Sequence, residues 1–98
     1  MGSSTMYELD IKPELDKILK KLSKKNLKQL IIVHKKIEEI RNNPNHDYKF
    51  LRKTLQTFSR VHIDNHFVLI FKIDRQKKIV EAYYYDHHDN VYKWRAQD

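Results

Sequence analysis

The stretch of sequence that decides the fold runs from Arg60 to Trp94 and reads RVHIDNHFVLIFKIDRQKKIVEAYYYDHHDNVYKW. Residues 60–63 alternate polar and apolar side chains, which predicts a strand with one buried face. Residues 67–73 are apolar on both faces, as is typical of a central strand covered on both sides. Residues 79–85 predict a further strand. The stretch therefore indicates an antiparallel sheet of three strands, or of four if residues 49–55 add one.

The residues before this stretch predict a short strand and a helical hairpin. Apolar side chains alternate over residues 7–11, and Pro13 suits the first turn of a helix. A break at residues 23–25 separates this helix from a second one, which ends at the Asn42-Asn43-Pro44 run. The predicted fold class is therefore α+β, with an N-terminal strand and an α-helical hairpin packed on one face of a small antiparallel sheet.

The alternation also predicts where the polar side chains of the sheet lie. If Phe67 and the apolar residues that follow it at every second position share the helix-packed face with Val61, residues 64–66 form a three-residue hairpin connection. Arg60 and His62 then lie on the opposite face, and His66 lies at the rim of the sheet.

Length and composition narrow the classes of function. The chain has 98 residues, enough for one domain, which we place at residues 6–98 because residues 1–5 resemble a vector-derived leader. The absence of cysteine excludes disulfides, thiolate metal sites and cysteine nucleophiles. A single glycine argues against phosphate-binding loops and dinucleotide sites, so we expect no cofactor. No apolar run could span a membrane and no signal-peptide pattern occurs, so we expect a cytoplasmic protein with no membrane partner.

The charge of the chain points to anionic partners. The net charge is +7 and the isoelectric point is near 9.6, so the surface attracts polyanions such as nucleic acid. Residues 12–41 alone carry ten basic and four acidic side chains. This half of the chain is either an ordinary solvated helix surface or a nucleic-acid footprint.

Three clusters in the last third could carry chemistry. His62 and His66 suit acid–base catalysis, because imidazole both takes and gives a proton near neutral pH, although they could also be plain polar residues at a sheet edge. The aromatic residues suit stacking on RNA bases or packing in a core. The DHHD run at residues 86–89 suits a divalent metal, but adjacent strand residues point to opposite faces. His87 and His88 can share an ion only if the strand has ended, and we therefore predict no metal.

These segments together resemble the RelE/ParE toxin superfamily, and in particular its YafQ-like branch of ribosome-dependent mRNA endonucleases. The similarity covers residues 6–94, and its most specific parts are HIDNHFVLIFKI and HHDNVY. The resemblance implies an active site at His62, His66, Phe67, His88 and Tyr92. The branch has an acidic residue at the position of His66. It also has a histidine in the loop before the sheet, for which His46 is the candidate once a gap in spacing is allowed.

The resemblance further implies RNA cleavage by proton transfer, without a metal. His62 and His88 would transfer protons, Phe67 and Tyr92 would orient bases, and cations would bind the RNA backbone. These cations are Lys49, Arg52, Lys53 and Arg60.

The partners implied by the resemblance are a cognate antitoxin, mRNA on the ribosome and, for the toxin–antitoxin complex, operator DNA. Two alternatives remain open at this stage. One is a ParE-like toxin that inhibits gyrase, and the other is a catalytically degenerate toxin homologue that only binds nucleic acid.

Overall fold

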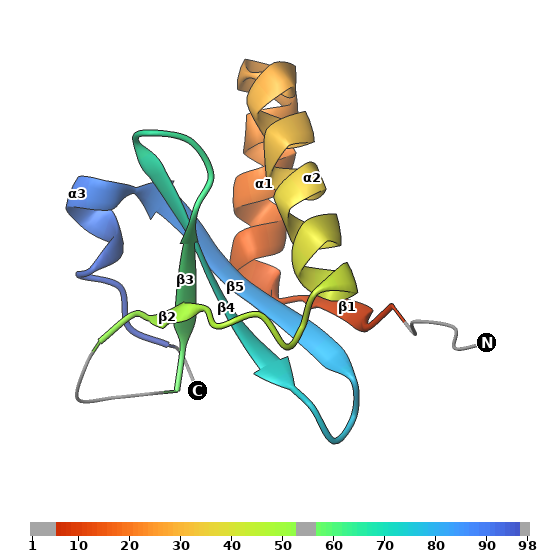
Figure 1. Ribbon diagram of the computed structural model, residues 1–98. Coiled ribbons are helices and arrows are strands. Elements are labelled where there is room, and N and C mark those ends of the chain that lie inside the picture. Colours follow the sequence, from red (N-terminus) through yellow and green to blue (C-terminus); the bar gives the residue numbers. More distant parts are fainter. Residues whose placement is uncertain (1–5, 53–56, 97–98) are drawn as a thin grey trace.

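The computed structural model describes residues 6–52 and 57–96 and confirms the α+β fold (Figure 1). Its elements are β1 (Glu8–Ile11), α1 (Pro13–Lys25), α2 (Leu27–Asn42), β2 (Lys49–Phe50), β3 (Ser59–His62), β4 (Phe67–Asp74), β5 (Ile79–His87) and α3 (His88–Val91). Five strands form one sheet in the order β1-β5-β4-β3-β2. The pairs from β2 to β5 are antiparallel, whereas β1 runs parallel to β5 and makes the sheet mixed.

The helical hairpin covers one face of the sheet (Figure 1). The predicted break at residues 23–25 is wrong, because α1 continues to Lys25 and Asn26 forms the joint. Ser23 donates its hydroxyl to the carbonyl of Lys20 at 2.6 Å and stays inside the helix. The Asn26 side chain caps α2 by accepting the backbone N–H of Gln29 at 3.1 Å. In the part of the chain described here, no helix combines the length and the apolar composition needed to cross a membrane.

The main hydrophobic core lies between the helices and the sheet. The sheet face that packs there carries Ile63, Leu69, Phe71, Val80, Ala82 and Tyr85, with Val61, Phe67 and Ile73 partly buried beside them. Leu15 and Leu19 of α1 and Val33, Ile37 and Ile40 of α2 supply the other side. The predicted register of the β3–β4 hairpin is confirmed, because the alternate apolar residues of both strands face the helices.

The opposite face of the sheet carries a second, smaller core. It consists of Leu51, Val68, Ile70, Val91 and Trp94, with Phe58, Tyr83 and Tyr84 partly buried against them. A register shift between Ile70 and Phe71 lets the adjacent residues Tyr83 and Tyr84 both pack on this side. The segment after β5 therefore returns over this face, as Figure 1 shows for α3. The part of the face near the end of β3 carries the polar side chains described next.

Candidate active site

Three strand ends meet at one end of the sheet. β3 ends at His62, β4 begins at Phe67 and β5 ends at His87. His62 is paired with Val68, a member of the second core, so His62 and Arg60 lie on the sheet face opposite the helices. This is the face that the alternation of residues 60–63 predicts.

A cleft of about 240 Å³ lies beside β3. It is lined by His46, Asp47, Tyr48, Lys49, Arg60, Val61 and His62. Lys49 and Arg60 are directly opposite each other in the β2–β3 ladder, which places two cations beside two imidazoles. Asp47 is the one acidic residue in this lining. The cleft thus brings together four of the predicted site residues, and its cations could bind a phosphate group.

The loop that brings His46 to the cleft is held by its neighbour Tyr48. The ring of Tyr48 packs edge-on against Phe71 of the main core, with centroids 5.2 Å apart, and the His46 ring packs edge-on against Tyr48 at 4.8 Å. Burial and the nearby Glu39 carboxylate raise the pKa of the Tyr48 hydroxyl. These contacts explain how a loop residue whose spacing requires a gap lines the same cleft as His62.

The remaining predicted residues take different places. Tyr92 is 43% exposed, and the Arg60 guanidinium lies 5.9 Å from the centre of its ring.

Arg52 donates to the backbone carbonyls of Tyr92 at 3.0 Å and Trp94 at 2.8 Å, so it anchors the C-terminal segment and is not in the cleft lining. Phe67 stacks on Tyr85 with centroids 5.1 Å apart, half-buried in the main core. Lys53 lies outside the described residues.

A second group of histidines lies where β5 meets α3. One potential ligand atom from each of His66, His87 and His88 lies within 4.8 Å of the other two. The backbone N–H of His88 donates to the carbonyl of His66 at 2.8 Å, which ties the β3–β4 turn to the end of β5. The strand ends at His87, so the condition under which His87 and His88 can face one another is met. We refer to these residues as the three-histidine cluster.

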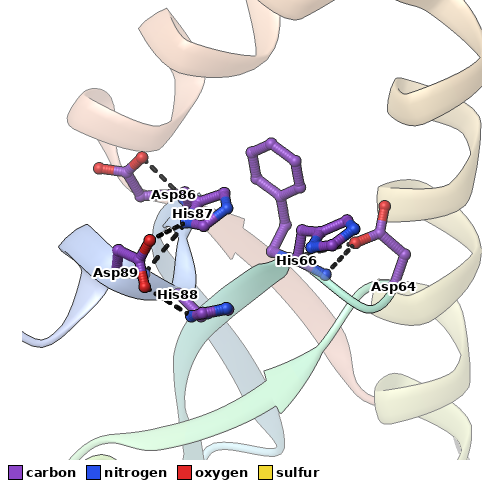
Figure 2. Close-up of polar contacts among 7 residues, drawn as sticks. Asp64, His66, Asp86, His87, His88 and Asp89 are labelled. Carbon is purple, nitrogen blue, oxygen red and sulfur yellow. Dashed lines mark hydrogen bonds and ion pairs between the residues drawn. The ribbon is translucent and has the colours of Figure 1, made fainter.

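Aspartates hold the backbone and the rings of this cluster (Figure 2). Asp64 Oδ1 accepts the backbone N–H groups of His66 at 2.8 Å and Phe67 at 3.1 Å, and Gln29 donates to Oδ2 at 3.1 Å. The hydrogen bond from the His66 backbone is the largest of the causes that lower the pKa of Asp64. Asp89 lies on the other side, with Oδ1 3.1 Å from His88 Nδ1 and Oδ2 3.4 Å from His87 Nδ1.

The third aspartate, Asp86, is held by hydrogen bonds within β5 itself. Asp86 Oδ2 accepts the hydroxyl of Tyr84 at 2.7 Å, and Oδ1 accepts the backbone N–H of His87 at 2.7 Å. Burial, together with this hydrogen bond, raises the pKa of Tyr84 to about 12. Tyr84 therefore stays protonated and donating over the whole physiological range.

Two relatives identify the family of the chain. A protein of Methanocaldococcus jannaschii named "Putative toxin RelE4" is 56% identical over 88 residues, which cover 90% of this chain and 93% of that protein. An uncharacterised protein of Methanosarcina mazei is 51% identical over 87 residues, which cover 89% of this chain and all of that protein. The chain belongs to the RelE toxin family. No protein-family model matches it.

Within this RelE-family fold, the two histidine groups lie at the same end of the sheet, where β3 and β5 end. In the described part of the chain, no hydrogen bond, ion pair or ring contact joins His62 to His88. One phosphodiester can be reached by both His62 and His88 only if it binds between the cleft and the end of β5. Arg60 of the cleft lining contacts the Tyr92 ring of the C-terminal segment, which places a charge and a ring beside the cleft.

The predicted site residues include His66 and His88 of the three-histidine cluster, but not His87 or the neighbouring Asp89. Both belong to the DHHD run, for which the sequence predicts no metal because adjacent strand residues point to opposite faces. The signal was that run itself, which crosses the end of β5. Recognising it needed the position at which β5 ends.

Proposed function

We propose that this RelE-family protein is a ribosome-dependent mRNA endonuclease of the YafQ-like branch that works by histidine acid–base catalysis. The observation that carries the proposal is the cleft that gathers His46, His62, Lys49 and Arg60. Imidazoles and cations in one concave site are the groups that phosphodiester cleavage requires. The toxin name of the relative from M. jannaschii supports the same class of function.

The proposed reaction begins with attack of a ribose 2′-hydroxyl on the adjacent phosphorus. The O2′–P bond forms and the P–O5′ bond breaks, which leaves a 2′,3′-cyclic phosphate and a free 5′-hydroxyl. One of His62 and His88 removes the proton of the 2′-hydroxyl, and the other supplies a proton to the leaving O5′. His46 and His66 flank these two residues in the cleft and in the cluster, and we propose that they belong to the catalytic set.

Lys49 and Arg60 are proposed to bind the scissile phosphate. Two like charges directly opposite each other in a sheet repel, and an anion between them relieves that repulsion while gaining charge-assisted hydrogen bonds. The same cations stabilise the additional negative charge that develops on the phosphate in the transition state. The exposed ring of Tyr92 is proposed to stack on a neighbouring base.

The proposed partners follow from the toxin function. A cognate antitoxin with acidic segments would be attracted by the +7 charge of the chain and would block the cleft when bound. We propose that the toxin acts in the cytoplasm on mRNA held by the ribosome, and that the toxin–antitoxin complex binds operator DNA.

The proposal is tested by inducing the chain in cells, recording growth and mapping the 5′ ends of cellular mRNA. The wild-type chain should arrest growth and create new mRNA ends, whereas His62→Ala and His88→Ala should lose both effects. His34→Ala removes an exposed histidine of α2 outside both groups and should behave as wild type. Arrest that persists in both folded site variants, with intact mRNA and broken DNA, would contradict the proposal and favour inhibition of gyrase.

A further inference from the structure

We propose that the three-histidine cluster is a binding site for a divalent transition-metal ion, with Zn²⁺ as the best-suited ion. The cluster unites residues from the β3–β4 turn, the end of β5 and the start of α3. Three imidazole ligands are a known zinc-binding set, and the remaining coordination position stays open. This inference concerns metal binding and stands independently of RNA cleavage.

The spacing of the three nitrogens suits one ion after a small closure. The ligand atoms lie within 4.8 Å of one another. Ligands at about 2.0–2.1 Å in a tetrahedral site are about 3.3 Å apart, so the nitrogens must close by roughly 1.5 Å at most. The His66 ring lies parallel to the His87 ring with centroids 6.0 Å apart, so these rings must also turn for their lone pairs to meet at one ion. The exposed position of His66 on a turn allows such a rotation. The ring centroids of His87 and His88 are already only 4.6 Å apart.

Asp89 contacts two of the rings and orients that of His88 for metal binding. Its carboxylate oxygens approach Nδ1 of His88 and Nδ1 of His87, and Figure 2 shows the second ring nitrogen of each residue turned away from Asp89. A carboxylate that accepts the Nδ1 proton leaves the Nε2 lone pair free to bind an ion. The backbone N–H of Asp89 also donates to His87 Nδ1 at 3.1 Å. In the absence of metal, His87 Nδ1 is thus an acceptor and its ring proton lies on Nε2. Metal binding through Nε2 requires that proton to leave and Nδ1 to be protonated, with Asp89 Oδ2, 3.4 Å away, as the new acceptor in place of the contact with the Asp89 N–H.

The charges around the cluster favour a cation. Asp64, Asp86 and Asp89 each contact a cluster residue through a hydrogen bond or an ion pair. Within residues 6–52 and 57–96, no lysine or arginine forms an ion pair with any of these three carboxylates. A basic chain thus keeps a local concentration of negative charge beside three imidazoles. Imidazole ligands select zinc, copper and nickel over magnesium and calcium.

The backbone around the cluster is held before any ion binds. The hydrogen bond from His88 N–H to the His66 carbonyl fixes the turn to the start of α3. Gln29 of α2 is buried and donates to Asp64 at 3.1 Å and to the Tyr85 hydroxyl at 2.7 Å, which anchors the same turn to the main core. Because the backbone is already held in place, metal binding costs less conformational entropy.

Metal binding would have a consequence that rests on the proposed function. A metal on His88 occupies the lone pair that proton transfer needs, so the metal-bound chain cannot use His88 as an acid or base. Metal binding and catalysis are therefore alternatives at this residue, and the ion acts as a reversible inhibitor.

The binding is tested by calorimetric titration of Zn²⁺ alone into the chain without RNA and without a polyhistidine tag. We expect one ion per chain. Each of His66→Ala, His87→Ala and His88→Ala should lower the affinity by more than the roughly 10–100-fold that loss of an outer-shell partner such as Asp89 costs. His34→Ala and His62→Ala remove histidines outside the cluster and should bind as wild type.

A second measurement does not depend on the folding of any variant. In nuclear magnetic resonance spectra of the wild-type chain, Zn²⁺ should shift the ring signals of His66, His87 and His88 and leave those of His34 unchanged. The proposal is overturned if the wild-type chain binds no Zn²⁺, or if the folded cluster variants bind it with unchanged affinity. Because no RNA is present, this outcome is independent of whether the protein cleaves RNA.

Discussion

Two groups of histidines at the same end of the sheet differ in the charges that surround them. His46 and His62 share a cleft with Lys49 and Arg60. The residues of the three-histidine cluster contact Asp64, Asp86 and Asp89 instead. The histidines of the cleft therefore lie beside cations that can bind an anion, whereas those of the three-histidine cluster lie beside carboxylates that favour a cation.

This difference teaches that a histidine's role is decided by its neighbours. Cationic neighbours concentrate phosphate and stabilise its charge, whereas carboxylate neighbours orient imidazoles and favour a bound cation. His88 lies beside a carboxylate, although the resemblance to the YafQ-like branch assigns it to RNA cleavage. The predictions below test whether the two groups are as separate as the contacts indicate.

The largest effect is expected from loss of a proton-transfer group. His88→Ala should reduce the single-turnover cleavage rate of mRNA on programmed ribosomes by about 10²–10⁴-fold, the usual contribution of a general acid or base. His34→Ala is the matched control and should cleave at the wild-type rate. A His88→Ala variant that is folded and cleaves normally would restrict the catalytic machinery to the cleft.

Zinc should occupy the three-histidine cluster and leave the residues of the cleft unchanged. Saturating Zn²⁺ should stop cleavage by the wild-type chain, and a chelator should restore it, because the ion occupies His88. The His87→Ala variant should need at least about tenfold more Zn²⁺ for half-inhibition relative to its own metal-free rate. Both proteins are assayed on the same ribosomes, which controls for zinc binding by the ribosome. Full activity with zinc bound to the cluster would show that His88 does not transfer a proton.

The cleft should carry the salt dependence of RNA binding. Replacing Lys49 and Arg60 by glutamine should weaken ribosome or RNA binding and flatten the logarithmic salt slope by about 1.4, since each single-strand phosphate contact contributes about 0.7. Lys24→Gln with Lys25→Gln removes the same charge from the exposed end of α1 and should leave the slope unchanged. The reverse result would move the RNA footprint to the helices.

The smallest effect concerns the turn that carries His66. Asp64→Ala removes the acceptor of three hydrogen bonds and should lower the free energy of unfolding at pH 7 by about 1 kcal/mol. The pKa of Asp64 is lowered in the folded chain, so its contribution is complete above the model-peptide value of 3.8 and is lost as the pH falls through the folded value.

Denaturant unfolding between pH 7 and pH 2.5 should therefore show the difference between wild type and Asp64→Ala shrinking with acidity. Asp64→Asn keeps an acceptor for the backbone N–H groups but has no charge, and it should lose less stability than the alanine variant. A constant difference at all pH values would mean that the carboxylate charge does not stabilise the turn.

The sequence allowed the sheet register to be predicted. The alternation around Val61 and the run that begins at Phe67 determine which side chains face the helices, because a shift of one residue would expose the whole apolar set. The second core could not be predicted in this way. It depends on Val91 and Trp94 returning over Ile70, and a contact between segments so far apart leaves no local periodicity.

The candidate site was predictable to a similar extent. The common face of Arg60 and His62 follows from strand alternation, but the approach of His46 depends on Tyr48 packing against Phe71 across the fold. The three-histidine cluster could not be predicted because it depends on the residue at which β5 ends. One more strand residue would have turned His88 away from His87, and local sequence does not fix the end of a strand that closely.

The chemistry of RNA cleavage is the central claim, and one substitution in the substrate tests it most directly. Ribosome-bound mRNA is prepared with a single 2′-deoxynucleotide on the 5′ side of the mapped cleavage position, next to an all-ribose control. The account predicts that only the control is cut, and that its products carry a 2′,3′-cyclic phosphate and a 5′-hydroxyl. Cleavage of the deoxy substrate at the same rate, or products with a 5′-phosphate, would contradict attack by the 2′-hydroxyl.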